Sequence, residues 1–336
     1  MGQRLNLHPN LSLKTCVLIY NPIAGRRPAR RENEIRRAAE VLEHSGLRVR
    51  LRPTTGPGTA QELARTATLD GCDLVLVCGG DGTINEVING LAPCQIPLGI
   101  LPGGTANILG KELQLPHNPI QAAAELPRWK PRRIALGQAT WNARLPDPAT
   151  GGTGVQGNTT PPGSAGPLRR YFLSVAGIGF DAHIVYRLSM PLKMSWGVAG
   201  FVFEAIRQWA RYPFPSFVCK MDNRESQATF AVIHRTRLYA GWLRLAPSAS
   251  LFEPRFTACL FPSRSRARYL LYAAAVVLRT HTRLHDVELV DAQKVSCAPA
   301  DNSAVLRFEL DGELVGALPA TFEVVPDALT LLAPQG

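Results

Sequence analysis

Charged side chains are scarce in this chain of 336 residues, where they make up 19% of the composition, less than is usual for a soluble globular protein. The charge is also unbalanced, because 37 Lys and Arg against 26 Asp and Glu leave a formal net charge of +11. A basic protein attracts polyanions such as nucleic acid, an anionic membrane or a polyphosphate substrate. The chain has no RNP-like aromatic motif, no zinc-finger spacing and no basic region followed by heptads, so we expect no nucleic-acid partner.

Cysteine pairs and long apolar runs are also missing. The seven cysteines occur singly, without a CxxC pair, which predicts buried thiols in a reducing compartment rather than disulfides or a zinc site. Residues 1–14 lack the apolar stretch of a signal peptide. The longest apolar stretches, near 196–203 and 269–278, fall short of the roughly 20 residues that a membrane span requires. We therefore expect a cytoplasmic protein that is peripheral at the inner membrane surface.

The first part of the chain alternates between two kinds of pattern. Short strand-like runs are separated by stretches with helical spacing of apolar residues, the strands at 16–20, 47–52, 74–78 and 97–101 and the helices at 30–44, 60–68 and 84–90. This alternation with short loops predicts a mostly parallel sheet covered by helices. Ligands of such sheets bind beyond the carboxyl ends of the strands.

Strand-like patterns dominate after residue 136. They occur at 171–175, 215–221, 228–235, 255–261, 287–290, 305–310 and 320–325, with helices expected at 195–210 and 268–278 and a Gly, Pro, Ser and Thr-rich flexible loop at 147–167. We therefore predict an α/β protein of two domains. An α/β domain with a mostly parallel sheet spans 14–136, with 319–336 as a candidate to complete it. A mostly antiparallel β domain spans 137–318, and the active site is expected in the cleft between the two.

The most informative segment is Gly79–Glu86, which reads GGDGTINE and directly follows the apolar run at 74–78. Glycines let backbone N–H groups approach phosphate oxygens because no Cβ stands in the way. Asp81 would repel a phosphate, so it suits a magnesium ligand or a hydrogen-bond acceptor. The segment lacks the Lys-Ser/Thr ending of a Walker A loop and does not fit GxGxxG. A plain Gly-Asp-Gly turn is the alternative interpretation.

Further motifs accompany this loop in a fixed order: Tyr20-Asn21-Pro22 with Gly25, TTGPG at 54–58, LPGGTAN at 101–107, AGIGFD at 176–181 and LDGE at 310–313. With them the chain resembles the diacylglycerol kinase and sphingosine kinase superfamily, and most closely its bacterial lipid kinases, from residue 18 to the end. The resemblance implies an ATP- and Mg²⁺-dependent kinase that phosphorylates a membrane lipid hydroxyl. Diacylglycerol is the expected acceptor, and a sphingoid base or ceramide is the alternative.

The resemblance also implies roles for individual residues. The nucleotide-binding set comprises Asn21, Pro22, Gly25, Thr54, Gly79, Gly80, Asp81, Gly82, Thr83, Asn85, Glu86, Gly104, Thr105 and Asn107, with Asp81 also near the magnesium ion of ATP. Asp181 is expected to contact the hydroxyl head of the lipid, although a polar strand end is an equal alternative. Arg26, Arg27, Arg30 and Arg31 either neutralise phosphates or form a solvated helix face.

Asp311 and Glu313 match the catalytic pair of the family. Residues two apart on a strand face the same side, so both carboxylates could point into one cleft. One would accept the proton of the lipid hydroxyl, with Asp311 favoured, while the other orients the hydroxyl or helps to hold magnesium. A solvated Asp-Gly hairpin turn is the alternative interpretation.

Two departures from the family pattern stand out. Ala135 replaces a residue that is often acidic, and segment 252–255 has only Glu253 where relatives often carry Asp-Asp-Gly. We therefore expect no structural magnesium site there. An NAD kinase, which shares the GGDGT loop, and a catalytically degenerate relative are the other functional alternatives. The expected partners are the lipid substrate and an anionic membrane surface, contacted through 196–203 and Trp209. A position in the core is the alternative for these aromatic residues, and homodimerisation is left open.

Overall fold

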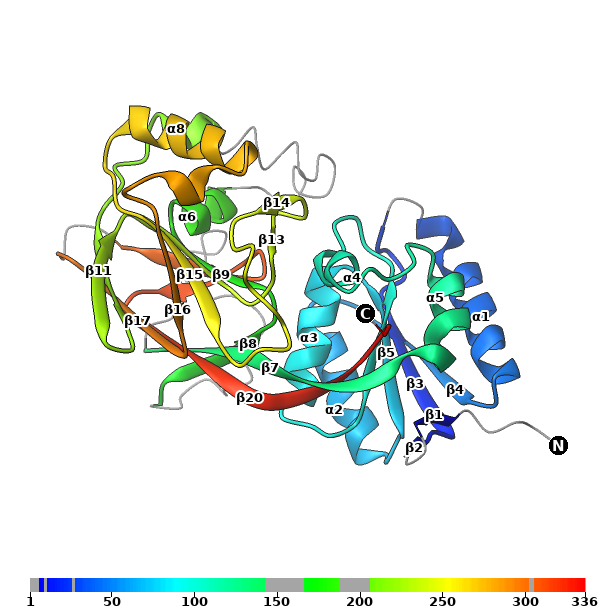
Figure 1. Ribbon diagram of the computed structural model, residues 1–336. Coiled ribbons are helices and arrows are strands. Elements are labelled where there is room, and N and C mark those ends of the chain that lie inside the picture. The colour runs from blue at the N-terminus through cyan, green and yellow to red at the C-terminus, as the bar shows by residue number, and fades with distance from the viewer. Residues whose placement is uncertain are drawn as a thin grey trace. The chain divides into compact units, whose positions relative to one another are not determined.

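The computed structural model describes residues 6–8, 11–25, 28–142, 166–187, 206–301 and 305–335. The chain divides into unit 1, Met1–Leu136 with Pro326–Gly336, and unit 2, Gly137–Val325 (Figure 1). Most of the expected loop at 147–167 and of the expected helix at 195–210 lies outside the described residues. The expected cleft between the units stays a prediction. None of the described helices is long and apolar enough to cross a membrane.

A parallel sheet forms the centre of unit 1. Its strands follow the order β6–β5–β3–β4, with β3 at Thr15–Tyr20, β4 at Arg48–Pro53, β5 at Leu74–Gly79 and β6 at Leu98–Pro102. β5 is buried at every position, because helices cover both faces of such a sheet and its central strands become continuously apolar. The N-terminal strands β1 (Asn6–His8) and β2 (Leu11–Ser12) form a separate antiparallel pair.

The helices of unit 1 pack in pairs. α1 (Pro28–His44) contacts α5 (Pro119–Glu125), and α2 (Thr59–Leu69) contacts α3 (Asp81–Leu91). The two pairs cover opposite faces of the sheet (Figure 1). The short α4 (Ile108–Glu112) follows β6, and a 3-10 turn at Leu126–Arg128 follows α5. The alternation of strand and helix predicted from the sequence is therefore confirmed.

The C-terminal strand completes this sheet. β20 (Ala320–Ala333) is much longer than the predicted strand at 320–325. Its first part pairs antiparallel with β17 (Lys294–Pro299) in unit 2, whereas Leu331 near its end lies opposite Leu98 of β6 in a parallel pairing. β7 (Lys130–Trp141) also begins in unit 1 and ends in unit 2.

Unit 2 contains two antiparallel layers. One follows the order β16–β15–β12–β9–β18–β19, with bounds Glu288–Ala292, Phe256–Phe261, Phe230–His234, Val175–Gly179, Arg307–Leu310 and Glu313–Ala317. The other joins β11 (Arg224–Ala228), β10 (Phe217–Met221), β17 and the first part of β20, with β7 paired to β8 (Leu168–Phe172). α6 (Phe180–Arg187), α8 (Arg266–Val277), a 3-10 turn at His281–Arg283 and the small pair β13 (Leu238–Tyr239) and β14 (Leu243–Arg244) lie outside these layers.

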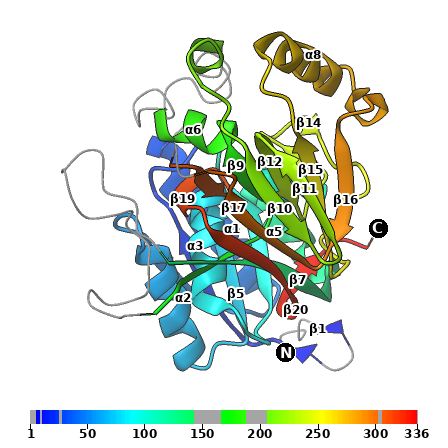
Figure 2. The same ribbon diagram turned by 90° about the vertical axis from the view of Figure 1, so that its left-hand side faces the viewer.

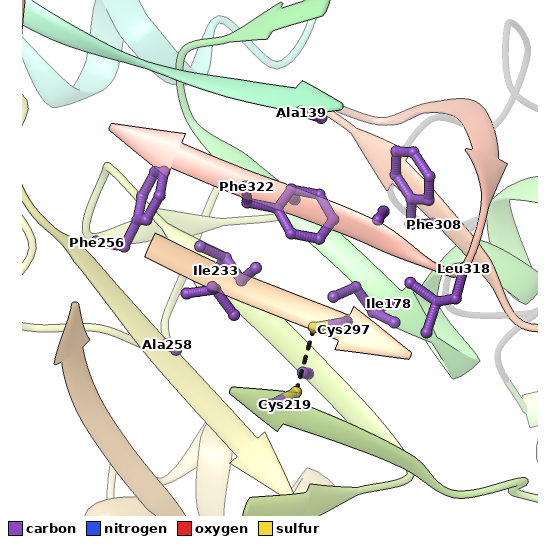
Figure 3. Packing of buried hydrophobic residues seen from close by; sticks show 14 of the residues in the cluster. Ala139, Ile178, Cys219, Ile233, Phe256, Ala258, Cys297, Phe308, Leu318 and Phe322 are labelled. Carbon is purple, nitrogen blue, oxygen red and sulfur yellow. Dashed lines mark hydrogen bonds between the residues drawn. The ribbon is translucent and has the colours of Figure 1, made fainter. Parts of the chain in front are cut away.

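Apolar side chains from both layers fill the space between them (Figure 3). Phe308 from one layer and Phe322 from the other pack edge to face, with their ring centres 5.5 Å apart. Cys219 and Cys297 lie opposite each other on β10 and β17 with their sulfur atoms 3.3 Å apart. The hydrogen bond to Cys219 and burial raise the pKa of Cys297, so this thiol stays neutral. All seven cysteines are free thiols and six of them are buried, which agrees with the prediction.

Candidate functional site

Four loops of unit 1 meet at one edge of the parallel sheet. Tyr20 at the end of β3 lies opposite Pro53 of β4 and Cys78 of β5, and Gly79 lies opposite Pro102 of β6. Because the strands end in register, the segments that follow them share this edge. These segments begin with Asn21, Thr54, Gly80 and Gly103 and contain most of the predicted nucleotide-binding residues.

Two of these loops touch through glycine backbones. A Cβ added to Gly104 would lie 2.3 Å from Cα of Gly80, and one added to Gly79 would lie 2.6 Å from Cβ of Thr83. Real Cβ atoms do not approach so closely, so both loops require glycine here. The contact lies beside the first residues of α3, whose amides cannot bond within the helix. Such a helix N-terminus attracts phosphate.

Asp81 holds the neighbouring loop. Its Oδ1 accepts the backbone N–H of Ile108 at 2.7 Å, at the start of α4. Burial raises the pKa of this carboxyl, and the backbone hydrogen bonds from Ile108 and Asn107 oppose the effect. The carboxylate is therefore used for hydrogen bonds between the loops at 79–82 and 103–108. Of its two expected roles, hydrogen-bond acceptor is the one that these contacts display.

Three other predicted side chains also serve the loops. Glu86 accepts the amides of Gly58 at 2.8 Å and Ala60 at 3.1 Å, which holds the TTGPG segment against α3. Asn107 accepts the amide of Gly104 and donates to its carbonyl. Asn85 is only 2% exposed. These residues shape the site, whereas Thr105 is exposed and Thr54 is partly exposed.

The loop after β3 is braced by Asn21 and by Arg31. Asn21 Oδ1 accepts the amide of Ile23 at 3.0 Å, and its Nδ2 donates to Thr83 at 3.5 Å. Arg31 on α1 is 6% exposed and donates to the carbonyls of Gly103 at 2.6 Å and Ala24 at 3.1 Å.

The solvated helix face that was one interpretation of the arginines is therefore wrong for Arg31. Its neighbour Arg30 is exposed, and Arg26 and Arg27 lie outside the described residues. Arg31 joins the loops after β3 and β6, and its position on a charged helix carried no signal of this role.

In unit 2 the catalytic candidates lie at a hairpin turn. Asp311 and Gly312 connect β18 to β19 with positive φ angles of 50° and 83°, as a tight Asp-Gly turn requires. Glu313 is the first residue of β19. The two carboxylates therefore do not lie on one strand, contrary to the prediction, because the chain reverses between them.

Asp311 and Glu313 have different surroundings. The Asp311 carboxylate accepts three backbone amides, from Leu173 and Ser174 at 2.8 Å each and from Val175 at 3.0 Å. Glu313 is instead paired with Arg170, a buried residue of β8 that the sequence analysis missed, and its side chain is 35% exposed. Asp311 therefore holds the turn against the segment before β9, while Glu313 retains access to solvent.

Asp181 belongs to a buried group behind the turn. Its carboxyl accepts a hydrogen bond from the Tyr239 hydroxyl and shares one with the carboxyl of Glu309. Glu309 in turn accepts the amide of Gly312. A Cβ on Gly177 would lie 2.0 Å from Oδ2 of Asp181 and 2.7 Å from Oε1 of Glu309, so the motif glycine makes room for both carboxyls. Asp181 is only 3% exposed, and Glu309 was not singled out from the sequence.

The two departures from the family pattern have clear structural settings. Ala135 is 5% exposed within β7. In the other segment, the carbonyls of Leu251 and Arg255 accept the guanidinium of Arg235 at 2.7 Å and 2.6 Å, and that of Glu253 accepts it as well. A buried arginine thus supplies the positive charge around which these carbonyls gather.

Comparison with known families agrees with this architecture. The family model described as diacylglycerol kinase catalytic domain matches residues 15–139. The model described as YegS C-terminal NAD kinase beta sandwich-like domain matches residues 174–333. The chain therefore carries a diacylglycerol kinase catalytic domain over residues 15–139, and the predicted resemblance is confirmed. It is accordingly a lipid kinase.

Proteins named diacylglycerol kinase match this chain over nearly their whole length. A diacylglycerol kinase from Bacillus subtilis is 26% identical over 315 residues, which cover 92% of this chain and 93% of that protein. One from Staphylococcus aureus is 25% identical over 326 residues, covering 96% and 93%. A Bacillus anthracis crystal structure named as a diacylglycerol kinase matches with a TM-score of 0.68 at 20% identity, over 95% of this chain and 97% of that one. The solved structure shows that the fold is shared.

Proposed function

We propose that this lipid kinase transfers the γ-phosphoryl group of ATP to the hydroxyl of diacylglycerol and so forms phosphatidic acid. The observation that carries the nucleotide assignment is the backbone contact between Gly80 and Gly104 at the start of α3. Neither glycine places a Cβ between its backbone and a phosphate group, and helix N-terminal amides favour anions. Hydroxyl groups of Thr54 and Thr105 lie on the same set of loops and suit further hydrogen bonds to phosphate.

Magnesium fits this donor set as an ion carried by the nucleotide. Among the described residues, no group of three or more His, Cys, Asp and Glu side chains could hold a metal. Mg²⁺ commonly binds through substrate phosphates with only one or two carboxylates. Asp81 is the carboxylate on these loops that could contact the ion. Its Oδ1 already accepts the amide of Ile108. The ion would neutralise charge that develops on the phosphoryl oxygens.

In the proposed reaction the lipid hydroxyl oxygen attacks the γ-phosphorus, the bond to the β–γ bridging oxygen breaks, and ADP leaves. The hydroxyl proton passes to a carboxylate. We assign this proton to Glu313, because Asp311 accepts three amides whereas Glu313 is partly exposed and held by Arg170. Asp311 then acts as a positioning residue for the turn that carries Glu313. Sphingoid bases and ceramide stay alternative acceptors.

An NAD kinase is the second candidate, because the matched C-terminal family is described as NAD kinase beta sandwich-like. The test is transfer of labelled γ-phosphate from ATP-Mg²⁺ to a panel of lipids in mixed micelles, with NAD included. We expect labelled phosphatidic acid. Label in NADP supports the second candidate, and label in a sphingoid base or ceramide changes the acceptor. Absence of label from every acceptor despite ATP binding contradicts the kinase mechanism.

A further inference from the structure

The solvent-facing side of α8 is apolar. Its inward residues Tyr269, Tyr272 and Val276 are buried, as expected for a surface helix. The outward positions carry leucine and valine instead of polar residues, with exposed fractions of 54% for Leu270, 43% for Leu271, 55% for Val277 and 71% for Leu278. Leu270 and Val277 are seven residues apart, about two helical turns, so they lie on one side of the helix, and Leu271 with the C-cap residue Leu278 forms an adjacent row with the same spacing. Large apolar side chains grouped in this way mark an interaction surface.

The helix is held firmly in this orientation. The Tyr269 hydroxyl bonds to the Thr229 hydroxyl at 2.7 Å, and its ring stacks on Phe214 with the ring centres 4.0 Å apart. Tyr272 donates to Asp286 at 2.5 Å, and Arg268 forms an ion pair with the same carboxylate. The helix lies at the end of unit 2 in both views (Figures 1 and 2). These contacts fix the inward side, so the leucines stay on the outside.

Positive charge surrounds this apolar face. Between Glu253 and Asp286 the chain contains no Asp or Glu but six arginines. Two of these arginines form ion pairs, Arg255 with Glu253 and Asp291 and Arg268 with Asp286. The other four are exposed and flank α8 at both ends: Arg264, Arg266, Arg279 and Arg283. Apolar residues bordered by arginine and lysine are typical of helices that lie in the interface of an anionic membrane.

We propose that α8 with its flanking arginines, the α8 face, docks the protein on the surface of an anionic lipid bilayer. Leu270, Leu271, Val277 and Leu278 enter the boundary between headgroups and acyl chains, and the arginines contact lipid phosphates. The inference rests on the proposed function, because diacylglycerol resides in a bilayer. A second copy of the chain fits less well, since a symmetric contact of this face with itself would place arginines near arginines.

The first experiment measures binding of the full chain, without nucleotide, to vesicles of phosphatidylcholine alone and of phosphatidylcholine with phosphatidylglycerol at about 7:3. We expect binding only to the anionic vesicles. Arg266→Gln with Arg279→Gln should weaken it roughly 25-fold, since each basic residue near such a surface contributes about fivefold. Leu270→Ser with Leu271→Ser should weaken it at least about tenfold.

Matched controls come from unit 1. Leu69→Ser removes a leucine that is 81% exposed at the end of α2, and Arg37→Gln removes an exposed arginine of α1. Both should bind anionic vesicles as the wild type does, and all variants should keep their melting temperature. Wild-type affinity in both α8 double variants would overturn the proposal. An equal loss in the control variants would also overturn it, because binding would then reflect net charge and exposed leucine in general.

A fluorescent label at Leu271→Cys, in a Cys94→Ser background, separates the other possible occupants. We expect polar emission in buffer and a blue shift with anionic vesicles. A blue shift in buffer that grows with protein concentration would mean that a second copy covers the face. A blue shift in buffer at every concentration would mean that the chain itself covers it. Either result overturns the proposal.

Failure of the kinase assignment can be told apart from failure of this inference. Vesicle binding is measured without ATP or catalysis, so it can persist in a chain that labels no lipid. If the lipid is the substrate, the α8 variants should lose phosphorylation of long-chain diacylglycerol in vesicles but keep it for a short-chain diacylglycerol dissolved in detergent micelles. Equal loss with both substrates would contradict a docking role.

Discussion

The carboxyl groups of Asp181 and Glu309 hydrogen bond to each other in the interior of unit 2. Two carboxyls can share a hydrogen bond only if one of them carries a proton. Burial raises the pKa of both groups, and the nearby charge of Asp181 raises that of Glu309 further. Tyr239, Asp311 and the amide of Gly312 also face this pair. The pair therefore keeps a proton at a pH where ordinary carboxyl groups have released it, directly behind the turn that carries Glu313.

This shared proton predicts a pH-dependent stability. The ordinary pKa values are 3.8 for Asp181 and 4.5 for Glu309, so the unfolded chain releases both protons above this range. The folded pair keeps one proton. Its contribution to the unfolding free energy is lost as the pH rises toward the raised pKa of the pair. The unfolding free energy should fall by roughly 1 kcal/mol per pH unit on this account.

Glu309→Gln tests this dependence, because the amide donates to Asp181 without a titrating proton. Urea denaturation from about pH 5 to about pH 8 should show the variant gaining stability relative to the wild type as pH rises. Glu225→Gln, which alters an exposed glutamate paired with Lys220, is the control. Parallel pH profiles for wild type and Glu309→Gln would show that no proton is shared.

The two catalytic candidates should fail in different ways. Glu313→Gln keeps the fold and removes the proposed proton acceptor, so kcat should fall by about 10²–10⁴ with little change in stability. Asp311→Asn places an amide NH₂ against backbone N–H donors, so it should also reduce the unfolding free energy by about 1–3 kcal/mol. Steady-state kinetics with urea denaturation measure both quantities. A large loss of kcat without destabilisation in Asp311→Asn would identify Asp311, instead of Glu313, as the acceptor of the lipid hydroxyl proton.

Gly104→Ala should disrupt the nucleotide loops. The added Cβ would meet Cα of Gly80 at 2.3 Å, and the loops would have to separate. We expect ATP affinity to fall at least about tenfold, because the amides at the start of α3 lose their arrangement. Gly56→Ala is a sharp control, since a Cβ there meets nothing within 4 Å. Titration calorimetry compares the two, and equal affinities would contradict the proposed phosphate site.

Arg235→Met should destabilise unit 2. Burial lowers the pKa of Arg235 to about 10, with Glu253 opposing the shift, so the guanidinium is charged at neutral pH. Its removal leaves the carbonyls of segment 251–255 without their donor, and we expect a loss of roughly 3 kcal/mol or more. Arg224→Met, at an exposed position of β11, should change stability by less than about 0.5 kcal/mol. Similar denaturation midpoints for the two variants would contradict this assignment.

Local patterns in the sequence were sufficient for much of the fold. The apolar run at 74–78 and the helical spacing at 30–44 correspond to β5 and α1, because a strand between two helical layers must be apolar and a covering helix must be amphipathic. β9 and β17 were missed. β9 contains two glycines, and β17 reads KVSCAP, so neither displays a strong strand pattern, and pairing with neighbouring strands decides their conformation.

The sequence by itself determined the family resemblance, the order of the loops and the residue types at the site, since glycine where backbones touch and aspartate at tight turns are local requirements. Only the tertiary structure decided what the side chains do. Arg31, Arg170 and Glu309 contact partners that are 72, 143 and 128 positions away in the sequence. No local pattern encodes such contacts. The same holds for Asp311, whose carboxylate is held by amides far away in the chain. Burial and partner geometry, rather than residue type, separate a side chain that binds a substrate from one that shapes the site.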